Sequence, residues 1–79
     1  MQAFNEKCDV LLRFLKDKGE ASWDVLFTAT AIQKNDGIVS YLKKTKDFVD
    51  YSGKGISLTA KGMDFISRTS FVEERDKMQ

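Results

Sequence analysis

The chain has 79 residues, of which 42% are hydrophobic and 32% are charged. This balance is typical of a globular domain rather than a disordered segment, and the length allows one domain with a modest core. The formal net charge is only +1, so bulk charge indicates no partner, and only the distribution of charges can indicate a nucleic acid.

The scarcity of histidine and cysteine excludes several kinds of site. The chain has no histidine and one cysteine, Cys8, so neither a serine-histidine-aspartate unit nor a cysteine-histidine unit can form within it. A zinc site with the usual ligands is almost excluded, and an intramolecular disulfide is impossible. The adjacent acids Glu73 and Glu74 lie in a charged tail, with no inferable apolar pocket around them. We therefore expect neither an enzyme nor a bound cofactor, and no small-molecule substrate.

The apolar runs are only a few residues long, and the N-terminus lacks the basic start and apolar run of a signal peptide. We therefore expect a cytoplasmic protein that does not enter a membrane.

A first helix is predicted over residues 4–18. Its apolar residues recur at helical spacing on one face, namely Phe4, Cys8, Leu11, Leu12 and Leu15. Asn5 is the expected N-cap, and Gly19 is expected to end the helix.

Two further helices are predicted before residue 46. Ser22 is expected to cap the first of them, whose apolar stripe comprises Val25, Leu26, Ala29 and Ile32, with Trp23 and Phe27 as a second edge. Asn35 is expected to cap the next. Its inward face is predicted to hold Ile38, Tyr41, Leu42 and Thr45 with Val39 beside them, and its outward face Asp36, Gly37, Ser40, Lys43 and Lys44.

A β-hairpin is predicted over residues 47–58, followed by a last helix. Val49 and Tyr51 should lie on one side of the first strand and Asp50 on the other. Gly53 and Gly55 are free to take positive φ in the turn. Thr59 is the expected N-cap of a helix that holds Met63, Phe65 and Ile66 and could extend to Phe71 and Val72.

Several segments resemble the winged helix-turn-helix superfamily of small prokaryotic regulators. They are residues 38–42, Phe48-Val49, Gly53-Lys54-Gly55 and residues 56–62. Within the last, Leu58-Thr59-Ala60-Lys61-Gly62 is similar to the family's recurrent Leu-Thr-x-Lys-Gly junction between a strand and a helix. The resemblance covers about residues 22–66. It implies an α+β winged helix, which we expect to span residues 1–72. Residues 73–79 are mostly charged and are expected to form a frayed tail.

The sequence departs from the family pattern around the hairpin. Asp47-Phe48 stands where family members usually carry Gly-Leu. The hairpin tip carries only Lys54, where many DNA-binding wings carry several arginines, and Asp50 lies nearby. These departures weaken the case for DNA binding more than the case for the fold.

The resemblance implies that the third helix enters the major groove of double-stranded DNA and the hairpin contacts the backbone. The chain would then act as a transcriptional regulator. From Lys34 to Lys61 there are six lysines and three aspartates, an excess of positive charge where DNA would lie. The expected contact residues are Gln33, Lys34, Asp36, Gly37, Ser40, Lys43, Lys44, Lys46, Lys54 and Lys61. The alternative is a winged helix used for protein-protein contact, which the near-neutral charge and the Trp23/Phe27 edge favour.

Specific binding by so small a domain would favour a homodimer. We expect the dimer contact on the C-terminal helix through Phe65, Phe71 and Val72, with the first helix as the competing element. Trp23 and Tyr41 are expected to pack in the core rather than to stack on bases, which leaves Tyr51 as the better candidate for an exposed aromatic. Cys8 is expected to be a buried small apolar side chain rather than a redox sensor.

Overall fold

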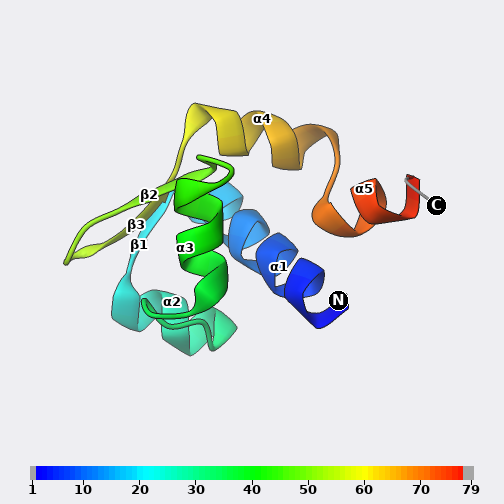
Figure 1. The fold of residues 1–79 in the computed structure, drawn as a ribbon. Helices are drawn as coiled ribbons and strands as arrows, with labels where there is room; N and C mark the ends of the chain where they lie inside the picture. The colour runs from blue at the N-terminus through cyan, green and yellow to red at the C-terminus, as the bar shows by residue number, and fades with distance from the viewer. Residues whose placement is uncertain (1, 78–79) are drawn as a thin grey trace.

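The computed structural model describes residues 2–77 and shows an α+β domain with five helices and a three-stranded antiparallel sheet. In chain order the elements are α1 (Gln2–Lys18), β1 (Glu20–Ser22), α2 (Trp23–Thr30), α3 (Gly37–Lys44), β2 (Val49–Tyr51), β3 (Gly55–Leu58), α4 (Ala60–Arg68) and α5 (Phe71–Lys77). The β2–β3 hairpin projects from the side of the domain opposite to α5 (Figure 1).

The central element is α1, which contacts the other four helices as well as β1 and β3. Its side chains at Cys8, Leu11, Leu12 and Leu15 are fully buried, as their spacing predicts. Gly19 ends the helix in the left-handed region at φ 83°. The N-terminal prediction was wrong, because α1 begins at Gln2 and Asn5 therefore lies within the helix instead of capping it.

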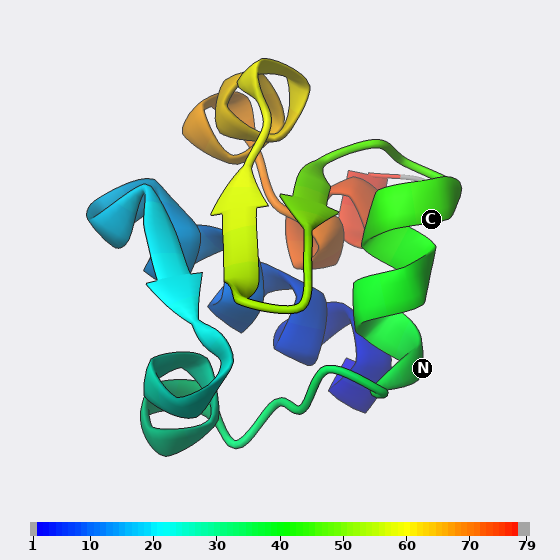
Figure 2. The same cartoon turned by 90° about the vertical axis from the view of Figure 1, so that its left-hand side faces the viewer.

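The sheet contains a strand that the sequence analysis did not predict. β1 pairs with β3, which pairs with β2, so β3 lies in the middle (Figure 2). Ala21, Ile56 and Tyr51 form one cross-strand row, and the adjacent row is Glu20, Ser57 and Asp50. Ile56 is buried whereas Glu20 and Asp50 are exposed, so the first row faces the core and the second faces outward.

Of the two hairpin glycines, Gly55 is required by a close approach between strands and not by the turn. Neither Gly53 nor Gly55 has a positive φ. A Cβ atom on Gly55 would overlap the carbonyl oxygen of Ala21, so glycine there lets β1 approach β3 closely.

The last predicted helix is in fact two helices. Thr59 caps α4 as predicted, since its hydroxyl accepts a hydrogen bond from the Gly62 amide at 3.0 Å. The chain then becomes extended at Thr69 and starts again as α5 at Phe71. Residues 73–77 are helical rather than frayed, and residues 78 and 79 of the predicted tail lie outside the described residues.

Candidate nucleic-acid interface

The orientation of α3 follows from its cap and its apolar residues. Asp36 is the N-cap rather than Asn35, because its carboxylate accepts a hydrogen bond from the Ile38 amide at 3.1 Å. The same carboxylate lies 3.7 Å from the Lys7 ammonium of α1. Asp36 therefore holds the start of α3 and is half-buried, which limits its role as a surface contact.

The inward face of α3 is made by Ile38, Val39 and Leu42, which are all buried. Tyr41 is half-buried, and Thr45 is exposed, so the prediction that Thr45 faces inward was wrong. The predicted outward residues Gly37, Ser40 and Lys44 are all exposed. These three residues give the helix a small, polar surface with one ammonium group, that of Lys44.

The hairpin is attached directly beside α3. The Phe48 amide donates to the Leu42 carbonyl oxygen at 2.8 Å, and the Lys43 ammonium donates to the Asp50 carboxylate at 2.7 Å. This hydrogen bond and the charge of the partner raise the pKa of Lys43 and lower the pKa of Asp50. Both groups stay ionised at neutral pH, so the Lys43–Asp50 pair carries no net charge.

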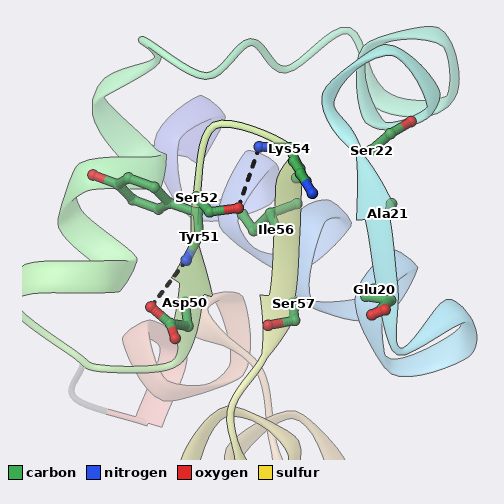
Figure 3. Close-up of a pocket in the computed structure, with 10 residues that line it drawn as sticks. Glu20, Ala21, Ser22, Asp50, Tyr51, Ser52, Lys54, Ile56 and Ser57 are labelled. Atoms are coloured by element: carbon green, nitrogen blue, oxygen red, sulfur yellow. Dashed lines mark hydrogen bonds between the residues drawn. The ribbon is translucent and has the colours of Figure 1, made fainter.

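The tip of the hairpin is held by α2. The Trp23 indole donates a hydrogen bond to the Ser52 carbonyl oxygen at 2.9 Å, and its ring meets Tyr51 edge-on at 5.8 Å. Within the turn, the Lys54 amide donates to the Ser52 hydroxyl at 3.2 Å (Figure 3). These contacts fix the position of the tip relative to the helices.

The lysines that were expected to contact DNA fall into three groups. Lys43 is paired with Asp50, and the Lys34 ammonium lies 5.8 Å from the Trp23 ring centroid, beside the hairpin tip. Lys44 is exposed on α3 and Lys54 is exposed on the hairpin turn, while Lys46 is half-buried in the segment that follows α3. Lys61 lies in the first turn of α4. This helix follows the C-terminal end of β3, whereas the hairpin turn precedes the N-terminal end of β3.

Five of the six lysines, together with the exposed Gln33 before α3, therefore lie on or next to α3 and the hairpin. They are Lys34, Lys43, Lys44, Lys46 and Lys54.

The outward face of the sheet forms an open hollow of about 530 Å³, which the sequence analysis missed. Its floor includes the outward row of Glu20, Ser57 and Asp50, and Lys54 lies at one end (Figure 3). A three-residue strand such as β1 gives too short an alternation to be recognised in the sequence. Without β1, the hollow could not be foreseen.

The aromatic residues and the cysteine mostly belong to the interior. Tyr41 packs its ring against Phe4 and Phe71, with centroids 5.2 and 6.1 Å away. Trp23 and Tyr51 are half-buried against each other. Cys8 is fully buried, and burial, followed by the charges of Asp9 and Asp36, raises the pKa of its thiol to about 12. The thiol therefore stays protonated and unreactive.

The residues expected to form a dimer contact are engaged within the chain. Phe71 is buried, and Phe65 is half-buried with its ring stacked on Phe48 at 4.7 Å. Val72 is half-buried as well. They were expected at an interface because a chain this short does not necessarily bury all of its apolar residues, and Phe71 is buried within its own chain.

Neither a metal centre nor a membrane-spanning helix is found within residues 2–77. Within residues 2–77, no three or more aspartate, glutamate, cysteine or histidine side chains converge as a metal site would require. The helices in the same part of the chain are all too short or too polar to cross a membrane.

The comparisons with known proteins found no relative. The chain matches no protein-family model, no curated protein sequence and no solved structure.

Proposed function

We propose that this chain is a winged-helix DNA-binding domain that acts as a small transcriptional regulator. In this proposal α3 enters the major groove, and the β2–β3 hairpin is the wing that contacts the backbone. The order of helix, strand, two helices and hairpin, with β1 added to the hairpin, is compatible with a winged helix.

The observation that carries the proposal is the uncovered outward face of α3 beside the hairpin. Gly37 lacks a side chain and Ser40 has a short one, so the helix offers little obstruction to a groove. Ser40 can bond to bases or phosphates, and Lys44 can neutralise a phosphate. Lys34 and Lys54 add positive charge near the hairpin tip.

A duplex-DNA titration at two or more salt concentrations tests the proposal. If three lysines contact phosphates, the logarithm of the affinity should fall against the logarithm of the salt concentration with a slope of about −3. Lys44→Glu should weaken binding by about tenfold and make the slope shallower by about one. Lys16→Glu is the matched control, because Lys16 is an exposed lysine of α1, outside α3 and the hairpin. Absence of binding at low salt by a folded protein contradicts the proposal.

One observation favours the alternative of a protein-binding module. Val25 and Phe27 of α2 are 51% and 47% exposed, which is unusual for apolar side chains of a helix in so small a domain. If the face of α2 that carries Phe27 binds a protein, Phe27→Ala should abolish that binding and leave any DNA affinity unchanged. Loss of DNA affinity in Phe27→Ala would instead place α2 in the nucleic-acid interface.

A further inference from the structure

The Lys43–Asp50 pair lies where the proposed wing meets the proposed recognition helix. Lys43 belongs to the last turn of α3, and Asp50 is the middle residue of β2. Their side chains are 37% and 64% exposed, so the pair is at the surface and its charges can reach solvent or a ligand. A DNA backbone that runs between α3 and the hairpin would pass over both charged groups.

Asp50 is held in place by more than its lysine partner. The oxygen that accepts from Lys43 also accepts a hydrogen bond from the Tyr51 amide at 3.0 Å, which orients the carboxylate on the outward face of the sheet (Figure 3). A phosphate bound beside this carboxylate would meet a fixed like charge. To bind Lys43, the same phosphate would have to displace Asp50 from it.

Lys43 has a second contact that does not depend on Asp50. Its ammonium lies 6.0 Å from the centroid of the Tyr51 ring, within the range of a cation–π interaction. Neutralising Asp50 should therefore leave Lys43 near its present position while making its charge available.

We propose that Asp50 restrains DNA binding by occupying Lys43 in the free protein, so that a phosphate must take this lysine from Asp50 when DNA binds. This inference rests on the function proposed above and deepens it by assigning Asp50 a role that opposes binding. Asp50 thus keeps the affinity of the α3 and hairpin surface for DNA lower than the lysines of this surface would otherwise make it.

The test measures the affinity of four folded proteins for one mixed-sequence duplex of about 20 base pairs, long enough to span the domain. They are the unmodified chain, Asp50→Asn, Lys43→Gln and the double variant. Asp50→Asn should bind about fivefold more tightly, as expected when Lys43 is released from an exposed ion pair. Its salt slope should be steeper by about 0.9, equivalent to one additional phosphate contact. In the Lys43→Gln background the same substitution should give a clearly smaller gain.

Glu20→Gln is the matched control. Glu20 lies in the same outward row of the sheet as Asp50, across Ser57, but on β1, two strands from the side of the sheet that meets α3. Glu20→Gln removes the same charge as Asp50→Asn. An equal gain in DNA affinity would therefore show only a general effect of net charge and would overturn the inference. Asp50→Ser serves as a second neutral variant, and thermal unfolding checks that each protein is folded.

The other outcomes are also distinct. If the unmodified chain binds DNA and Asp50→Asn binds equally or more weakly, the pair positions the wing and the inference is wrong while the proposed function stands. If neither protein binds duplex DNA at low salt, the proposed function fails and the inference fails with it.

Discussion

Asp9 is a carboxylate in the interior of the domain, and at 3% exposure it needs partners. Its two oxygens accept hydrogen bonds from the amides of Phe71 and Val72, at 2.7 and 3.2 Å. These are amides in the first turn of α5, which have no partners within the helix. A residue of α1 therefore acts as the cap of a helix more than 60 positions later in the chain.

Replacing Asp9 by alanine should leave those amides without acceptors and lower the free energy of unfolding by about 2 kcal/mol. Urea denaturation followed by circular dichroism measures this change. Asp17→Ala is the control, because the Asp17 side chain is 81% exposed on the same helix, and it should change stability by no more than about 0.5 kcal/mol. Equal effects of the two substitutions would contradict the capping role.

At the scale of elements, the junction between β3 and α4 shows why a glycine is required there. Gly62 is buried in the first turn of α4, and a Cβ atom at this position would overlap the carbonyl oxygen of Phe48. The Phe48 carbonyl oxygen also accepts a hydrogen bond from the Thr59 amide at 3.0 Å. The start of α4 is thus pressed against the segment that leads into the hairpin.

Gly62→Ala should force these segments apart and destabilise the domain by about 1–3 kcal/mol. Gly37→Ala provides the comparison, since a Cβ atom on this glycine at the start of α3 would meet nothing within 4 Å. That substitution should leave stability unchanged or raise it by up to about 1 kcal/mol through helix propensity. Thermal unfolding of both variants distinguishes the two positions, and a neutral Gly62→Ala would show that the junction can open without cost.

The elements that the sequence predicts well are those with a local signal. The buried face of α1, the caps at Ser22 and Thr59 and the hairpin all depend on residues within a few positions of each other. The capping by Asp36 instead of Asn35 shows the usual uncertainty of one residue at a helix end. β1 was missed because three residues show too little alternation, and the break between α4 and α5 depends on Asp9, which lies far away in sequence.

The candidate site was predictable only in part for the same reason. The exposed residues Gly37, Ser40 and Lys44 follow from the period of α3. The pairing of Lys43 with Asp50 does not, since it depends on how the hairpin folds back beside α3. Counting lysines in the sequence therefore overstated the number of cations available to DNA.

At the scale of the whole molecule, Phe71 joins parts of the chain that are distant in sequence. Its ring lies 6.1 Å from Tyr41 of α3, 6.0 Å from Phe48 before β2 and 5.0 Å from Phe65 of α4. The same residue receives the Asp9 cap through its amide. α5 thus closes the core on the side away from the hairpin (Figure 1), and its Phe71 contacts Tyr41 of α3.

Phe71→Ala should therefore destabilise the domain by about 3 kcal/mol, the loss expected when a buried aromatic ring is removed. Phe27→Ala makes the same chemical change at a ring that is 47% exposed on α2, and it should cost less than about 1 kcal/mol. Urea denaturation at two protein concentrations measures both effects. Because the Phe71 ring is buried within its own chain, the loss of stability in Phe71→Ala should be the same at either protein concentration. A loss that grows with protein concentration would instead indicate that Phe71 stabilises a contact between two copies of the chain.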